Sequence, residues 1–115
     1  MTNNNTTNKF VLNLGISPDF QGYAYVIEAI NMVKKMRLNN EPVRKFTQLY
    51  SDIAQKFDAK AQRVERDIRY AIEKAFIRNS AQLKEMCEAF LEGSNKVTNS
   101  CFICTVAEYL IMNGM

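Results

Sequence analysis

The run AQRVERDIRYAIEKAFIR, residues 61–78, constrains the fold of this chain more than any other segment. Its apolar residues recur every three or four positions, so at about 100° per residue they share one side of a helix. That side holds Val64, Ile68, Ala71, Ile72 and Ala75, with Ala61 and Phe76 beside them. The opposite side holds Gln62, Arg66, Tyr70 and Glu73, with Arg63 beside them and Arg69 on the flank. The run therefore predicts an amphipathic helix with one buried face and one charged face.

The rest of the chain repeats this helical spacing and shows no strand-like alternation that persists. Only two prolines and four glycines interrupt the 115 residues. We expect helices over residues 9–14 (ended by Gly15), 22–37, 42–57, 59–78 and 81–91, and a last helix reaching about Met112. Pro42 suits a first helical turn, Asp58 is expected to cap the fourth helix, and Thr98, Asn99 or Ser100 the last. The prediction is an all-α, compact six-helix domain over residues 9–115, preceded by a disordered polar leader over residues 1–8.

Composition excludes several function classes. The chain has no histidine, which removes the commonest general base and every catalytic triad or metal site that needs an imidazole. Cys101 and Cys104 have a CxxC spacing, but a structural zinc site needs four ligands and the chain offers three cysteines in total. We expect this pair to line a core, and we expect no metal and no cofactor. Paired carboxylates and a glycine-rich phosphate loop are both missing, so the chain is not expected to be an enzyme.

No secretory signal is recognisable, and no apolar run approaches the roughly 20 residues of a membrane span. We therefore expect a cytoplasmic protein with no membrane partner.

Positive charge is concentrated in the middle of the chain. Residues 34–78 hold twelve Lys/Arg and six Asp/Glu, a local +6, whereas the remainder holds three Lys/Arg and six Asp/Glu, or −3. Such an uneven distribution is typical of a surface that binds an anion such as nucleic acid.

The spacing of three residues predicts a helix-turn-helix over the third and fourth helices. Ala54 is small enough for two helices to cross closely, and Asp58 lies four residues later, where a turn residue must tolerate the left-handed conformation. Val64 follows as the apolar residue that holds the angle between the helices. Many helical hairpins share this spacing.

The charged face of residues 61–78 has two interpretations. In one, Arg63, Arg66 and Arg69 read guanine edges in a major groove and Glu65 accepts from a cytosine amino group. In the other, the face is only solvated and carries local ion pairs, such as Arg69 with Glu65 or Glu73.

Four motifs resemble a known family, the C-terminal effector domain of the sporulation response regulator, stage-zero sporulation protein A. They are GYAYVIEAINMV (22–33), LYSDIAQKF (49–57), QRVERDIRYAIEKAF (62–76) and KVTNSxFIxxVA (96–107). The resemblance covers most of residues 12–110 and implies a six-helix fold that binds double-stranded DNA at short promoter boxes, often in tandem. It favours the first interpretation of the arginines.

The resemblance also implies individual roles. Arg63, Glu65, Arg66 and Arg69 match the family's DNA-contacting run. Further contacts with the DNA backbone or flanks are expected from Lys45, Lys56, Lys60, Gln62, Tyr70 and Lys96. Tyr70 departs from the histidine usual in the family, which puts any contact from that side chain in doubt. The last helix is expected to support a homodimer on tandem sites through Phe102, Val106 and Leu110.

Two departures from the family pattern affect the expected regulation. The chain holds no phosphoacceptor receiver domain, so phosphorylation is not expected to control it in cis. Residues 79–95 match poorly where the family engages the RNA polymerase sigma subunit, so DNA binding is expected to survive better than activation. The implied source is a Gram-positive spore-forming bacterium, with the protein on its nucleoid.

Two hypotheses follow. The main one is a sequence-specific, DNA-binding transcription regulator. The alternative is a non-catalytic interaction protein, a decoy that antagonises a full-length sporulation regulator or its polymerase partner. The arginine run favours the main hypothesis.

Overall fold

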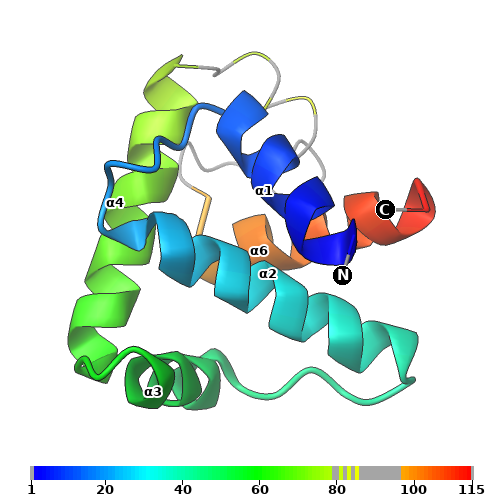
Figure 1. The fold of residues 1–115 in the computed structure, drawn as a ribbon, viewed down its shortest axis with the longest axis horizontal. Helices are drawn as coiled ribbons and strands as arrows, with labels where there is room; N and C mark the ends of the chain where they lie inside the picture. The colour runs from blue at the N-terminus through cyan, green and yellow to red at the C-terminus, as the bar shows by residue number, and fades with distance from the viewer. Residues whose placement is uncertain (1, 79–80, 82, 84, 86–96, 115) are drawn as a thin grey trace.

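The computed structural model describes residues 2–78, 81, 83, 85 and 97–114, and all regular structure in this part of the chain is helical. The helices are α1 (Thr2–Asn13), α2 (Gly22–Leu38), α3 (Phe46–Lys56), α4 (Ala61–Arg78) and α6 (Asn99–Met112) (Figure 1). The prediction of an all-α domain is confirmed. Five helices rather than six are found among the described residues, because the helix predicted at 81–91 lies outside them apart from Ala81, Leu83 and Glu85, which are helical.

Helix α2 is the centre of the arrangement. It packs against α1, α3, α4 and α6, and in Figure 1 it crosses the middle of the molecule with α1 above it, α3 below and α4 at one end. Its buried residues Val26, Ala29, Ile30 and Val33 are fully inaccessible to solvent. One continuous apolar core therefore joins all five helices.

Helices α1, α2 and α3 are each followed by a residue in the left-handed conformation that closes the helix. Gly15 has φ 97°, Asn40 has φ 59° and Asp58 has φ 55°. Each follows its helix with the paired backbone hydrogen bonds of a Schellman motif, for example from Ala59 N–H to the Ala54 carbonyl at 2.8 Å. The prediction that Gly15 ends the first helix is confirmed.

The starts of three helices differ from the predictions. Helix α1 begins at Thr2 rather than at residue 9, so it includes residues 2–8 of the expected polar leader. The reason is a tertiary contact, since the Thr7 hydroxyl is buried and donates to Asn31 Oδ1 on α2 at 2.8 Å. Helix α3 begins at Phe46 rather than Pro42, because residues 41–45 run without helical bonds from the end of α2 while Val43 packs on the core.

Helix α4 begins at Ala61 rather than residue 59. The first helical bonds run from the N–H groups of Arg63 and Val64 to the Lys60 carbonyl, both at 3.0 Å. Asp58 is thus the turn residue after α3 and not the cap of α4. By contrast, Thr98 does cap α6 as one of the predicted residues, since its hydroxyl accepts from Cys101 N–H at 3.1 Å.

Gly22 brings α2 and α4 into close contact. A Cβ atom added at this position would lie 2.2 Å from the Asp67 carbonyl oxygen, which is far inside van der Waals contact. Only glycine fits there without moving a backbone. The first turn of α2 therefore lies directly against the middle of α4 and fixes its position.

Candidate nucleic-acid interface

One face of α4 is anchored in the core. Val64, Ile68, Ala71, Ile72 and Ala75 are its buried residues, the same five that the helical spacing predicted. The helix is thereby held along its whole length, and its remaining side chains are presented to solvent on a rigid support.

The connection between α3 and α4 matches the predicted hairpin residue by residue. Ala54 is 5% exposed within α3, Asp58 adopts φ 55° in the turn, and Val64 is fully buried at the start of α4. The two helices pack directly against each other. The turn places the first residues of α4 at a corner of the molecule, next to α3 (Figure 1).

The four predicted base readers are all exposed on α4. Their side chains have relative exposures of 52% for Arg63, 49% for Glu65, 68% for Arg66 and 53% for Arg69. At about 100° per residue, Arg66 projects from the centre of the exposed face, Arg63 lies on one flank, and Glu65 and Arg69 lie on the other. The structure therefore brings these side chains together on one helix and spreads them across its solvent side.

Each of these arginines has an acidic neighbour. Arg63 Nε lies 3.5 Å from Asp67 Oδ2, Arg66 Nε lies 3.9 Å from Asp67 Oδ1, and Arg69 Nη1 lies 3.7 Å from Glu65 Oε2. All three distances exceed those of good charge-assisted hydrogen bonds, so these exposed pairs are weak. The guanidinium groups remain available to another acceptor. Asp67 was not among the predicted site residues, although its i,i+4 spacing from Arg63 was visible in the sequence.

The residues predicted to contact the DNA backbone or flanks lie in different surroundings. Lys60 and Gln62 are exposed at the start of α4, and Lys45 is exposed just before α3. Lys56 is also exposed, but its ammonium group already lies 2.9 Å from Glu28 Oε1. Lys96 lies outside the described residues.

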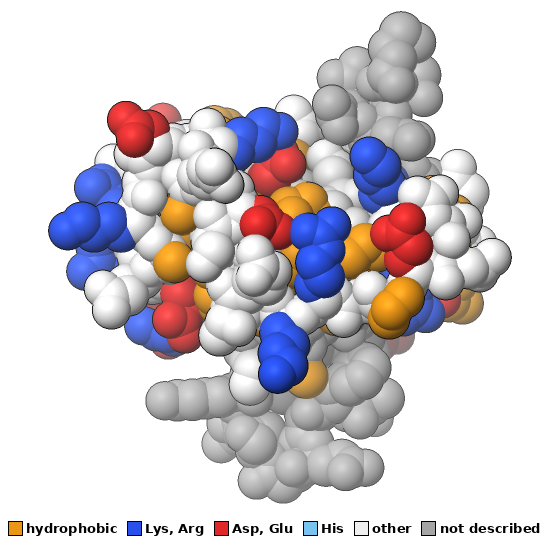
Figure 2. Space-filling view, turned by 90° about the horizontal axis from the view of Figure 1, so that it is seen from below, with side chains coloured by type: hydrophobic (Ala, Val, Ile, Leu, Met, Phe, Trp, Pro, Cys, Tyr) orange, Lys and Arg blue, Asp and Glu red, His pale blue; other side chains and the backbone are white. Residues whose placement is uncertain are grey.

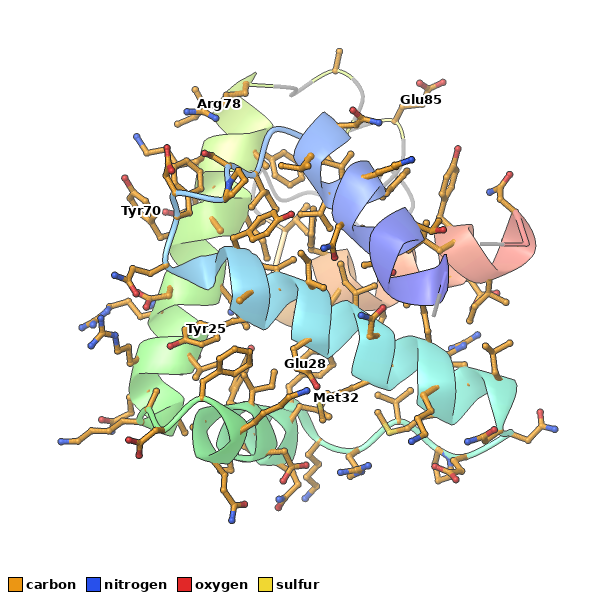
Figure 3. The ribbon with its side chains drawn as sticks, viewed as in Figure 1. Tyr25, Glu28, Met32, Tyr70, Arg78 and Glu85 are labelled. Atoms are coloured by element: carbon orange, nitrogen blue, oxygen red, sulfur yellow. The ribbon has the colours of Figure 1, made fainter. Side chains whose placement is uncertain are left out.

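Tyr70 is half exposed and belongs to a small aromatic and cationic cluster. Its ring meets Phe20 edge-on with centroids 5.9 Å apart, and Lys74 Nζ lies 5.4 Å from the Tyr70 centroid. Figure 3 shows Tyr70 projecting from the part of α4 farther from α3. Tyr70 is therefore supported on two sides, at the edge of the predicted interface.

A hollow of about 810 Å³ opens beside the first turns of α4. It is lined by Tyr25, Phe57, Asp58, Ala59, Lys60, Gln62, Arg63 and Arg66. We call it the turn hollow, because the α3–α4 turn forms its wall. In Figure 2 basic side chains gather at the edge of the molecule where Figure 1 places α4. The helical spacing of residues 22–37 gave no sign that Tyr25 would border this site.

Asn99, the first residue of α6, links α6 to α3 and to α4 near Glu65. Its amide Nδ2 donates to Tyr50 Oη on α3 and to the Glu65 carbonyl on α4, each at 3.2 Å. Burial raises the pKa of the Tyr50 hydroxyl above its usual value, which keeps it a neutral acceptor and donor. The sequence offered Asn99 only as a candidate helix cap, because its two partners are distant in the chain.

Self-association was predicted to involve Phe102, Val106 and Leu110. Direct contact of these side chains with a second copy is not possible in this structure. All three side chains are 0% exposed. They recur every four residues along α6 and pack against α2 and α4, so they form part of the core and offer nothing to a partner. The prediction that residues 79–95 engage polymerase poorly falls on a segment outside the described residues, apart from positions 81, 83 and 85.

Cys101 and Cys104 are half-buried free thiols on α6. Burial raises the pKa of the Cys104 thiol above its usual value. Among the described residues, no group of three His, Cys, Asp or Glu side chains is placed to hold a metal ion. Within the same residues, no helix is long and apolar enough to cross a membrane.

The geometry described above is an anchored helix with an arginine-rich solvent face beside a tight turn. A family model, that of the C-terminal domain of the sporulation initiation factor Spo0A, matches residues 7–110. The chain belongs to this family. The Spo0A C-terminal domain is the DNA-binding effector domain of a response regulator that controls transcription in sporulation, and the family is not one of enzymes.

Proposed function

We propose that this chain is a sequence-specific transcription regulator that inserts α4 into the major groove of short promoter boxes. In this proposal α3 and α4 act as a helix-turn-helix, with α4 as the recognition helix. The observation that carries it is the exposure of Arg63, Glu65, Arg66 and Arg69 on a helix whose opposite face is fully buried.

The chemistry of these side chains suits base readout. An arginine pairs two donors with O6 and N7 of guanine, and a carboxylate accepts from the N4 amino group of cytosine. From Arg63 to Arg69 the helix rises about 9 Å, which corresponds to roughly three base steps. Glu65 and Arg69 on one flank of α4 would meet one wall of the groove, while Arg63 on the other flank would meet the opposite wall.

On tandem boxes, we propose that two copies bind side by side. Any contact between them through α6 falls to its outer face, where Tyr109 is 41% exposed and Met112 is 75% exposed, because the predicted apolar contacts are buried. A contact with the polymerase sigma subunit would involve residues 79–95. The proposed DNA binding does not depend on either of these partners.

A binding-site selection from random duplexes, followed by a mobility-shift titration of the selected box, tests the proposal. We expect a retarded complex with the box at nanomolar to micromolar protein and weaker binding to a scrambled duplex of the same composition. The triple variant Arg63→Ala, Arg66→Ala, Arg69→Ala serves as the matched loss-of-function control. Unchanged migration of every duplex at micromolar wild-type protein would contradict DNA binding and favour the alternative, an interaction protein or decoy.

A further inference from the structure

The turn hollow is bordered by a tyrosine hydroxyl for which the described residues provide no hydrogen-bond partner. Tyr25 is 8% exposed, and its ring packs edge-on against Phe57 with centroids 5.3 Å apart. Its hydroxyl has no hydrogen-bond partner within the described part of the chain and is not one of the buried unpartnered atoms, so the buried ring presents its hydroxyl to the solvent in the hollow. Figure 3 shows the Tyr25 side chain lying between α2, α3 and the first turns of α4, where the hollow opens.

The charges around this hydroxyl favour an anion. Lys60, Arg63 and Arg66 contribute three positive charges to the lining, and Asp58 contributes one negative charge. Lys60 is exposed, so its ammonium group can turn toward a ligand in the hollow at little cost. A hydroxyl donor held in place by a buried ring and surrounded by excess positive charge suits phosphate oxygens.

The size and place of the hollow indicate the source of that phosphate. At about 810 Å³ it is several times larger than a single phosphate ion and opens widely to solvent. It also lies immediately beside Gln62 and Arg66 on the exposed face of α4, where a bound duplex would pass. A stretch of sugar–phosphate backbone fits these conditions better than an isolated anion.

We infer that the turn hollow binds a phosphate group of the DNA backbone, with the Tyr25 hydroxyl as a hydrogen-bond donor and Lys60 as the cation. The inference rests on the proposed function. It adds a contact between α2 and the DNA backbone to the contacts proposed for α4. Because the Tyr25 ring is buried and packed on Phe57, its hydroxyl would set the depth and register of α4 in the groove better than flexible surface lysines do.

The variant Tyr25→Phe tests the inference, because it keeps the ring packing on Phe57 and removes only the hydroxyl. We expect affinity for the selected box and for a scrambled duplex to fall by the same factor, roughly tenfold, as a hydrogen bond to a charged group would require. Tyr23→Phe is the matched control: it lies on the same helix and is partly buried, but it does not line the hollow. We expect that control to bind both duplexes as the wild type does.

The salt dependence of binding distinguishes the contribution of the Tyr25 hydroxyl from that of the Lys60 charge. Lys60→Gln should make the dependence of log affinity on log salt shallower by about one unit, whereas Tyr25→Phe should leave that slope unchanged. Single phosphates of the box can be replaced one at a time by uncharged methylphosphonates. At one position we expect the replacement to weaken binding by the wild type but not by Tyr25→Phe, which already lacks that contact. Wild-type affinity for Tyr25→Phe on both duplexes would overturn the inference while leaving DNA binding intact.

The free anion is distinguished by titrating the protein with inorganic phosphate without DNA. We expect no saturation at millimolar phosphate, since the hollow is larger than the ion. Saturable binding in the micromolar range that Tyr25→Phe abolishes would assign the hollow to a free phosphate compound and overturn the DNA assignment. Failure of the wild type to bind any duplex would instead contradict the proposed function itself.

Discussion

Asp67 shows how single residues shape the charged face of α4. Its side chain is 15% exposed, and it faces Arg63 and Arg66 at 3.5 and 3.9 Å. Asp67 Oδ2 is buried and has no hydrogen bond among the described residues. A carboxylate in this position attracts two guanidinium groups without holding either firmly, so both keep donors free for a base or a phosphate.

Arg66 is the side chain best placed to read a base. It is the most exposed of the three arginines and projects from the centre of the solvent face. We expect Arg66→Ala to weaken binding to the selected box by about 1–3 kcal/mol and to change binding to a scrambled duplex much less. Fluorescence anisotropy with both duplexes measures the difference. Arg37→Ala is the matched control, because Arg37 is paired with Glu108 near the end of α2 far from α4. An equal loss on the two duplexes would make Arg66 a phosphate contact.

Asp58 carries backbone strain that a glycine would relieve. The left-handed conformation at φ 55° costs an ordinary L-residue about 1–2 kcal/mol, whereas glycine gives up only about 0.5–1 kcal/mol of chain entropy. We therefore expect Asp58→Gly to raise the free energy of unfolding by up to about 1 kcal/mol and Asp58→Val to lower it by a similar or larger amount. Urea denaturation followed by circular dichroism measures both. Equal stability of the glycine and valine variants would show that the turn is not strained.

At the scale of the helices, two contacts position α4. Gly22 allows α2 to lie against the Asp67 carbonyl, and Asn99 ties α4 to α3 and α6. Both contacts use backbone atoms of α4, the carbonyls of Asp67 and Glu65, and leave its exposed side chains free. The support of α4 and the side chains of the proposed interface therefore do not compete for the same atoms.

We expect Asn99→Ala to lower the free energy of unfolding by about 1–3 kcal/mol, because it leaves the Tyr50 hydroxyl and the Glu65 carbonyl without their amide partner in a buried site. Thermal and urea unfolding measure the loss. Asn113→Ala is the matched control: the Asn113 amide also donates to a backbone carbonyl, that of Tyr109 at 2.7 Å, but in an exposed position. A loss at Asn99 no larger than the loss at Asn113 would show that the three-helix contact contributes little to stability.

At the scale of the whole molecule, local patterns were predictable from the sequence and long-range contacts were not. The buried stripe of α4 and the turn at Asp58 depend on spacing along one segment, and both were predicted. The early start of α1 depends on Thr7 meeting Asn31, and the border role of Tyr25 depends on the α3–α4 turn lying beside α2. The apolar spacing of α6 likewise marked its buried side, but spacing alone does not tell a core from a partner surface.

The uneven charge of the chain gives the last prediction. Lys9 on α1 and Lys60 before α4 are both exposed, and Figure 1 places α1 away from the first turns of α4. Lys9→Glu and Lys60→Glu change the net charge equally, from +3 to +1. If the local field of the middle segment drives association, Lys60→Glu should weaken DNA binding roughly tenfold or more at low salt, while Lys9→Glu should weaken it only slightly, because the Debye length at 0.1 M salt is about 10 Å. Anisotropy titrations between 50 and 200 mM salt, chosen to span the range where phosphate contacts lose affinity steeply, measure both variants. Equal losses would show that net charge, and not the surface around α4, governs the encounter with DNA.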